Sequence, residues 1–362
     1  MRFGLVPYDL GLEKSAQHAD CYQQFLEQAV LAEETGFDSV WLGENHFTST
    51  AVNSSAEALG AAVATVTEGI RIGIIPALGL NNPLYIAEDV AVLDSIANGR
   101  VIVAARTPYA HECASLGINP QEIRGRFIEA FDVLRKAWAP SSFSHQGTFW
   151  RIPGQDFSGN PFAQGVTKVN VVPKPAQLAV PLWVFCWGSS TIDLASSLGA
   201  PWLGPSVDSV QELAHKHETY NAVFGNSSMA RGNLLSPVIR EVYLGETLEE
   251  ARADAERGLL ELYRKYREAG LFAGPVDDFS RLAGDRFIIG DVDHVIDEIG
   301  RYQREAGINY LICRMQFPGM SHDKAKAAIK FFGQAVIPEF RMDSFPREIR
   351  KHSRRAESGE QR

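Results

Sequence analysis

The sequence predicts an α/β fold, namely a (β/α)8 TIM barrel with an inserted hairpin and loop region and a mobile C-terminal tail. Strand and helix patterns alternate four times in the first 110 residues, and this alternation requires a parallel sheet with helices outside it. The strands are almost continuously aliphatic, as parallel strands covered on both faces are. An open doubly wound sheet would meet both observations too. Because no G-x-G-x-x-G follows the first strand, where a dinucleotide-binding sheet carries it, the barrel is favoured.

The first half of the chain is regular. Phe25 and Ala29 lie on one apolar helix face at a four-residue spacing, and Gly36 follows where a left-handed residue commonly ends a helix. Asn82 and Pro83 suit the N-cap and the first position of a later helix. The expected strands here are 3–7, 39–42, 71–78 and 101–105, and the helices between them are 22–35, 54–67 and 83–97.

The second half is less regular. Residues 139–181 are rich in Ser, Gly, Pro and Gln, and we interpret them as a hairpin and loop inserted after a helix at 123–138. Residues 271–287 are expected to form a loop long enough to serve as a lid. We expect residues 1–343 to form one domain with eight strands and residues 344–362 to form a flexible tail. The remaining expected strands are 182–186, 201–204, 237–244 and 310–314, and the remaining helices are 191–197, 208–224, 249–269, 292–306 and 324–336.

Composition disfavours several classes of function. With 35 basic and 44 acidic side chains, the net charge of -9 repels nucleic acids and anionic membranes. Four cysteines without C-x-x-C spacing indicate a reducing compartment, and no uncharged apolar run has the length of a membrane helix, so a cytoplasmic protein is expected. His215 and His217 are two residues apart on a polar helix and point to different faces, so we expect solvated residues and no metal site.

Four segments resemble a known family when taken in order. Residues 36–47 read GFDSVWLGENHF, residues 83–100 read PLYIAEDVAVLDSIANGR, residues 173–184 contain PKPAQ and PLWV, and Gly290 precedes AGIN at 306–309. Over roughly residues 1–340 the chain resembles the bacterial luciferase-like family of flavin-dependent monooxygenases. The resemblance implies flavin mononucleotide (FMN) at the C-terminal ends of the barrel strands, FMNH2 supplied by a separate flavin reductase, O2 and a small organic molecule as substrates, and a homodimer.

One group of residues is expected to bind the cofactor. The segment 188–191 stands between a strand and a helix, where a helix N-terminus offers N–H groups and its dipole to a phosphate, although an ordinary N-cap fits the same residues. The resemblance places a phosphate-binding arginine at Arg106. Tyr109 would contact the flavin or lie in a surface loop, and Trp187 would stack near the flavin or line the barrel mouth. The expected cofactor-binding residues are Pro76, Ala77, Arg106, Tyr109, Trp187, Gly188, Ser189, Ser190 and Thr191.

The expected catalytic residues are Glu44, Asn45 and His46, in the loop after the second strand. The family carries a pair of histidines in this loop, and here the first of the pair is Asn45, whose amide cannot take up a proton near neutrality. Either His46 replaces it as acid and base, or the reaction needs no strong base, or His46 is structural. The family's cysteine beside the flavin corresponds to Ala105, so no thiol chemistry is expected there.

Two further expectations concern the barrel mouth. The resemblance implies a cis peptide under the flavin ring at the end of the third strand, and the proline in Ile75–Pro76 lowers the cost of a cis bond from ~3 to below ~1 kcal/mol. The Ile75–Pro76 bond is therefore predicted to be cis. Arg314 and Gln316 leave the last strand at the mouth, where Arg314 would bind substrate or flavin, or pair with Glu44.

Three functions follow from these expectations. The first is a two-component monooxygenase, because the chain shows no second nucleotide-binding fold. The second is hydride transfer with a deazaflavin on the same barrel, without oxygen. The third is a non-catalytic flavin-binding relative, for which the replacements at Asn45 and Ala105 are mild support.

Overall fold

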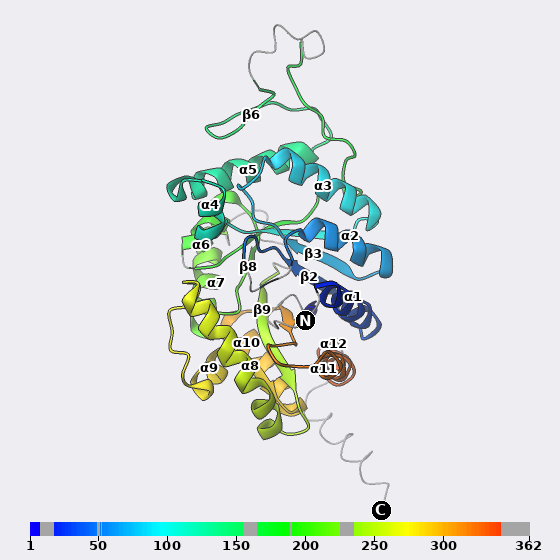
Figure 1. The fold of residues 1–362 in the computed structure, drawn as a ribbon, viewed down its shortest axis with the longest axis vertical. Helices are drawn as coiled ribbons and strands as arrows, with labels where there is room; N and C mark the ends of the chain where they lie inside the picture. Colours follow the sequence, from blue (N-terminus) through cyan, green and yellow to red (C-terminus); the bar gives the residue numbers. More distant parts are fainter. Residues whose placement is uncertain are drawn as a thin grey trace, which may run out of the picture.

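The computed structural model describes residues 1–7, 18–48, 51, 53–154, 165–188, 190–224 and 235–341. A parallel sheet of nine strands curls through the middle of the molecule, and helices cover its outer face (Figure 1). This TIM-barrel-like α/β architecture agrees with the expected fold class. The strands, in their order across the sheet, are β10 (Ile288–Gly290), β9 (Pro237–Leu244), β11 (Tyr310–Arg314), β1 (Arg2–Val6), β2 (Ser39–Gly43), β3 (Arg71–Ile75), β4 (Val101–Ala105), β7 (Leu182–Phe185) and β8 (Trp202–Leu203).

The sheet curls back on itself between β8 and β9. The backbone N–H of Gly204 donates to the carbonyl of Pro237 at 2.9 Å, and the N–H of Ile239 donates to the carbonyl of Gly204 at 3.0 Å. Strand β10 pairs only with the end of β9, from Val242 to Leu244. The sheet thus holds one strand more than the eight expected, because the three residues of β10 are too short a run to show a periodicity.

Most helices lie where their apolar spacing predicts them. One correction concerns residues 271–287, where helix α9 (Phe279–Arg286) occupies the second half of a stretch that was expected to be loop. Short helices show less than two turns of periodicity, so the sequence pattern also misses α4, η1 and α12. The helices are α1 (His18–Glu34), α2 (Ala56–Val66), α3 (Pro83–Ile96), α4 (Ala110–Ser115), the 3-10 helix η1 (Pro120–Glu122), α5 (Ile123–Trp138), α6 (Ser190–Leu198), α7 (Val210–Phe224), α8 (Leu248–Glu268), α9 (Phe279–Arg286), α10 (Val292–Ala306), α11 (His322–Ala335) and α12 (Ile337–Arg341).

Local sequence sets several helix ends. The side chain of Asn82 accepts a hydrogen bond from the N–H of Leu84 at 3.0 Å, and Pro83 occupies the first helical position, as predicted. Gly36, just after α1, has a φ of +89°, a left-handed conformation that glycine adopts without a steric cost. These boundaries of α1 and α3 are therefore explained by the residues that the sequence places there.

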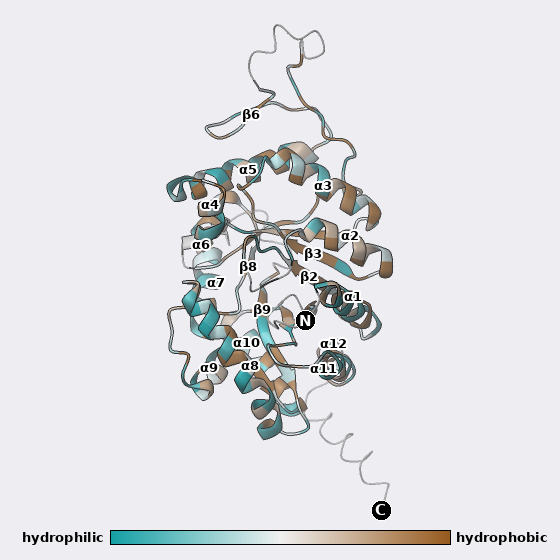
Figure 2. Ribbon diagram, in the orientation of Figure 1, coloured by the Kyte–Doolittle hydropathy of each residue, from teal (hydrophilic) through white to brown (hydrophobic). Residues whose placement is uncertain are grey.

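Apolar side chains fill the inside of the curled sheet. Trp41 of β2 is fully buried, and glycines stand beside it on both neighbouring strands, Gly4 on β1 and Gly73 on β3. A Cβ atom at Gly73 would collide with the indole ring, so the small residue makes room for the large one. Figure 2 shows β2 and β3 mostly in the hydrophobic colour, whereas α1, α7 and α8 carry much of the hydrophilic colour.

Part of the segment at 139–181 forms a short antiparallel pair of strands, β5 (His145–Gln146) and β6 (Arg151–Ile152). Glu129 of α5 fixes the connection between them, since its carboxylate accepts hydrogen bonds from the backbone N–H groups of residues 148, 149 and 150 at 2.7–3.2 Å. The same carboxylate lies 3.1 Å from Nε2 of His145. This pair of strands is tied to α5 rather than to the central sheet (Figure 1).

The structure does not describe every segment whose conformation is predicted from the sequence. The expected tail at 344–362 lies outside the described residues, and so do residues 8–17, in a loop that was expected to help form the substrate pocket. Among the helices that are described, none combines the length and apolar character needed to cross a lipid bilayer.

Candidate functional site

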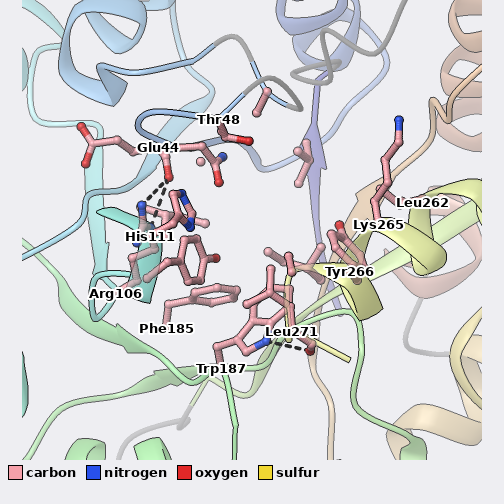
Figure 3. A pocket seen from close by; sticks show the side chains of 18 of the residues that line it. Glu44, Thr48, Arg106, His111, Phe185, Trp187, Leu262, Lys265, Tyr266 and Leu271 are labelled. Carbon is pink, nitrogen blue, oxygen red and sulfur yellow. Dashed lines mark hydrogen bonds between the residues drawn. The ribbon is translucent and has the colours of Figure 1, made fainter. Parts of the chain in front are cut away.

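A cavity of about 460 Å³ opens at the carboxyl ends of the parallel strands (Figure 3). This is the end of a barrel at which strand-to-helix loops carry binding and catalytic residues, and the volume lies in the range of small-molecule and cofactor pockets. The floor of the cavity is apolar and is made by side chains that fill the inside of the sheet: Val6, Trp41, Ile75, Phe185 and Ile239.

Trp187 lies in one wall of the cavity and contacts the other residues of that wall. Its Nε1 donates a hydrogen bond to the carbonyl of Leu271 at 3.0 Å. Its ring packs edge-on against Phe185, Tyr266 and Tyr109, with centroid distances of 5.7, 5.8 and 6.2 Å. Trp187 lies at the mouth of the barrel and lines the cavity, where its side chain joins the end of β7 to the segment after α8 (Figure 3).

The last turns of α8 form the adjoining wall, with Leu262, Lys265 and Tyr266. The sequence predicts this helix but not its place at the site. Strand β9 runs three residues past Glu241, the partner of Arg314 at the end of β11, and so α8 starts beyond the shared edge of the sheet. The apolar spacing of Leu262 and Tyr266 shows only which face of α8 is buried, so no sequence signal points to the cavity.

Glu44 and Asn45 line the cavity, whereas His46 is not among the lining residues. The Glu44 carboxylate accepts a hydrogen bond from the N–H of Ala77 at 2.6 Å and lies 3.4 Å from Nε2 of His46. The hydrogen bond with Glu44 raises the pKa of His46 above its ordinary value, against the lowering effect of burial. His46 is therefore linked to the cavity by its contact with the Glu44 carboxylate. Ala77 contributes its backbone N–H, which donates to that carboxylate.

Arg106 and Tyr109 both line the cavity, but the Arg106 guanidinium is buried, with 3% of its surface exposed. It pairs with both carboxylate oxygens of Glu112 at 2.5 and 2.8 Å and donates to the carbonyls of Glu44 and Thr107. The ring of Tyr109 lies 4.2 Å from its Cζ. Glu112 was not identified from the sequence, because a carboxylate in the first turn of a short helix is common.

The prediction of a cis bond at Ile75–Pro76 is wrong. The cis bonds among the described residues are Ile152–Pro153 and Val172–Pro173. The backbone at Pro76 continues the parallel ladder beyond β3, because its carbonyl accepts from the N–H of Arg106 at 3.0 Å. A trans peptide keeps the chain extended along that ladder. Pro76 is also not among the residues that line the cavity.

Arg314 lies at the cavity as expected, but its partner differs from the one expected. Its Nη1 is 3.0 Å from the Glu241 carboxylate and 2.9 Å from the Tyr266 hydroxyl. The suggested pairing with Glu44 is therefore corrected. Glu241 is the nearer carboxylate because it stands directly opposite Arg314 in the register of β9 and β11.

Gln316 does not reach the cavity, which corrects its assignment to the barrel mouth. The side chain is buried between α1 and α11, where it accepts a hydrogen bond from Gln28 at 2.5 Å and donates to the carbonyl of Met320 at 3.2 Å. The alternation of sides along a strand ends with β11 at Arg314, so Gln316 does not share its direction.

In the segment 188–191, Gly188 lies just before α6, and Ser190 and Thr191 are the first two residues of this helix. Gly188 has a φ of +89°, and the hydroxyl of Thr191 donates to the carbonyls of Trp187 and Gly188 at 3.1 and 2.8 Å. Neither Gly188 nor Thr191 is among the lining residues of the cavity. Ser189 lies outside the described residues, as does the side chain of Ser190.

The described part of the chain holds no group of three or more His, Cys, Asp or Glu side chains arranged to bind a metal ion. His215 is exposed, as expected of a solvated residue. His217 is only partly exposed, which corrects the expectation that it is fully solvated. Its Nδ1 lies 3.2 Å from the Ser236 hydroxyl, and burial lowers its pKa.

Comparison with known proteins gives a family and two kinds of relative. The sequence model of the family described as luciferase-like monooxygenase matches residues 1–309. Limonene 1,2-monooxygenase of Rhodococcus erythropolis is 26% identical over 333 residues, which cover 90% of this chain and 83% of that protein. F420-dependent glucose-6-phosphate dehydrogenase of Amycolatopsis mediterranei is 24% identical over 357 residues, which cover 88% of this chain and 95% of that protein.

A solved structure shares the fold. The oxygenating constituent of 3,6-diketocamphane monooxygenase from Pseudomonas putida, a type II Baeyer-Villiger monooxygenase in complex with FMN, superposes with a TM-score of 0.76. The match covers 94% of this chain and 98% of that protein at 18% identity. The likeness therefore concerns the fold.

Proposed function

This chain belongs to the luciferase-like monooxygenase family, a family of flavin-dependent oxidoreductases, and from that premise we propose that it is a two-component monooxygenase. It takes FMNH2 from a separate reductase and inserts one oxygen atom of O2 into a small organic substrate. The observation that carries the proposal is the cavity at the carboxyl ends of the strands, which combines an apolar floor with a carboxylate, Glu44, at its edge.

The residues of the cavity fit a flavin ring. A planar aromatic ring system of this kind is stabilised by apolar and aromatic neighbours and a small number of placed polar groups. Trp41 and Phe185 supply aromatic surface at the floor, Trp187 supplies it at the wall, and Asn45 offers both a donor and an acceptor at the edge. We propose that the ring lies between the floor and these residues.

When bound, reduced FMN supplies the electrons with which O2 is activated. The contribution of the chain is to exclude water and to move protons. Trp187, Tyr266 and the carbonyl of Leu271 close one side of the cavity through the ring contacts and the hydrogen bond described above. The carboxylate of Glu44 accepts a proton at the cavity and exchanges it with Nε2 of His46 at 3.4 Å.

The tail of the cofactor is proposed to extend toward the segment 188–191. Gly188 lies just before α6 and Thr191 lies in its first turn, where the backbone N–H groups of a helix N-terminus favour an anion. The expected second phosphate ligand, Arg106, would have to leave Glu112 in order to bind. We therefore assign the phosphate to the segment 188–191 rather than to Arg106.

A second candidate function is hydride transfer with a deazaflavin. The similarity to an F420-dependent dehydrogenase, over 88% of this chain, favours it. In this reaction O2 takes no part, and the cavity has to hold the deazaflavin and an oxidisable or reducible substrate together. The apolar floor and Glu44 serve either cofactor, so a direct comparison of the two has to separate them.

Anaerobic titration with FMN and with F420, followed by quenching of tryptophan fluorescence, provides that comparison. We expect FMN to bind more tightly. Oxygen is then admitted to the FMNH2 complex with a panel of small apolar molecules, and the expected product is one oxygen atom heavier than its substrate. Tighter binding of F420, with reduction or oxidation of a substrate under anaerobic conditions, would establish the second candidate instead. Oxygen consumption that never exceeds that of free FMNH2 would indicate a non-catalytic flavin-binding protein.

The partners follow from the same proposal. The purified protein alone should not oxidise NADH, and added flavin reductase should start the reaction. NADH oxidation by the pure protein would contradict the two-component assignment. We also propose a homodimer located in the cytoplasm, and sedimentation equilibrium would measure the assembly.

A further inference from the structure

The guanidinium of Arg106 has no N–H left for a ligand. An arginine side chain carries five N–H donors. Its Nε donates to the Glu44 carbonyl, its Nη1 to the carbonyl of Thr107 and one oxygen of Glu112, and its Nη2 to the Glu44 carbonyl and the other oxygen of Glu112. All five donors are therefore used within the protein.

Glu112 is the centre of this arrangement. Its carboxylate is fully buried and accepts, besides the two bonds from Arg106, the backbone N–H of His46 at 3.1 Å and that of Tyr109 at 2.8 Å. Burial alone would raise the pKa of Glu112, but the hydrogen bonds from Arg106 and the two backbone groups lower it below its ordinary value. The group is therefore an ionised carboxylate that joins three segments: the loop after β2, the end of β4 and the start of α4.

A phosphate bound to Arg106 would separate the Arg106–Glu112 ion pair. The guanidinium would have to turn away from Glu112, whose charge would then be buried without a cation, and burying a single charge is far costlier than burying a pair. The carbonyl of Glu44 would lose its donors at the same time. The positive charge of Arg106 therefore neutralises Glu112 and stabilises the backbone at the edge of the cavity.

We propose that Glu112 is a positioning residue that holds Arg106 as a clamp at the cavity edge and does not release it to the phosphate of the cofactor. Arg106 then fixes the backbone at Glu44, while the Glu112 carboxylate fixes the backbone at His46 and Tyr109. This inference rests on the proposed function in one respect, namely that a flavin occupies the cavity.

Two double-mutant arms test it. In the first, Arg106→Met, Glu112→Gln and the double variant are unfolded in urea. Gln keeps the shape and one acceptor but removes the charge, so the double variant leaves no unpaired buried charge. We expect it to lose less stability than the sum of the two single variants, and strictly additive losses would overturn the clamp. Glu122→Gln, which removes a partly exposed carboxylate paired with Arg126 away from the cavity lining, is the control and should be nearly neutral.

The second arm separates the phosphate from the ring. The Kd values for riboflavin and for FMN are measured on the wild type and on the double variant, and their ratio reports what the phosphate contributes. We expect that ratio to stay within about twofold. A fall of about tenfold or more, the loss expected when a charged hydrogen bond to the phosphate is removed, would show that Arg106 is a phosphate ligand. If the wild type binds neither flavin, the proposed function fails, and the urea arm still decides the clamp.

The positioning role of Glu112 has its own signature. Glu112→Gln should shift the amide NMR resonances of His46 and Tyr109, whose N–H groups bond to the carboxylate, and should lower the titration midpoint of the His46 ring. Glu122→Gln should leave both unchanged. Unaltered amide resonances and an unaltered midpoint in Glu112→Gln would contradict the role.

Discussion

Buried carboxylates organise the polar residues of the cavity. Glu44 holds His46 and the backbone at Ala77, and Glu112 holds Arg106 together with the loop that carries His46. Each carboxylate accepts several donors, and this satisfies charges that would otherwise be costly in a low-dielectric site. The chemistry of the site therefore depends on groups behind the cavity as well as on those that face it.

The pair of Glu44 and His46 predicts a pH-dependent stability. The pKa of His46 is raised in the folded protein, chiefly by Glu44, so the stabilisation is complete below the unfolded value near 6.5 and is lost as the pH rises through the folded value. His46→Gln should therefore be less stable than wild type at pH 5.5, and the difference should shrink by pH 8.5. Urea midpoints at both pH values measure this. His215→Gln, at an exposed histidine, is the control, and a difference that grows with pH would contradict the pairing.

The hydrogen bond of Trp187 predicts a local effect. Trp187→Phe keeps an aromatic ring but leaves the carbonyl of Leu271 without its donor, so we expect a loss of about 1 kcal/mol in the free energy of unfolding and faster proteolysis after residue 271. The matched control is Trp138→Phe, which removes a hydrogen bond to Ala87 far from the cavity. It should cost a similar free energy without exposing the segment. Equal proteolysis of both variants would argue against the role of Trp187.

At the level of single residues, the sequence predicts the types of side chain better than their partners. Glu44, Asn45, Arg106 and Trp187 do lie at the cavity, because each follows the carboxyl end of a parallel strand. Gln316 does not, because it stands two residues beyond the end of β11 and its side chain is hydrogen-bonded to Gln28. Partners such as Glu112 depend on distances between segments, which no local pattern contains.

At the level of elements, the cavity is built by helices whose apolar faces the sequence shows but whose positions it does not. Helix α8 is predicted at nearly its observed bounds, yet its role as a wall depends on how far β9 extends beyond β11. That extension is stabilised by β10, a strand too short to be predicted. The position of α8 at the cavity therefore depends on packing between distant segments, which the apolar periodicity of the sequence does not show.

The pair β5 and β6 provides a prediction at this level. Hydrogen bonds from Trp150 and Phe149 and from His145 lower the pKa of Glu129, although burial, the largest single effect, raises it. The stabilisation is therefore present above the unfolded value near 4.5 and is lost as the pH falls through the folded value. Glu129→Gln should cost roughly 1–3 kcal/mol, and hydrogen exchange of residues 145–152 should accelerate at pH 7. Glu122→Gln serves as the control, and unchanged exchange in Glu129→Gln would contradict this role.

At the level of the whole molecule, the fold class is the most predictable feature. Alternating strands and helices with continuous aliphatic strands leave few architectures, and the missing glycine motif selects between them. The nine strands of the sheet and their order agree with this TIM-barrel-like class. The ligand is less predictable, since the same fold serves both flavins and deazaflavins among the relatives.

The most direct test of the central claim is a crystal structure of the protein soaked with FMN. We predict density for the flavin ring in the cavity, in contact with Trp41, Phe185 and Trp187, with the phosphate at the turn before α6 and Arg106 still paired with Glu112. A ring bound elsewhere, or a cavity without density at saturating FMN, would contradict the account.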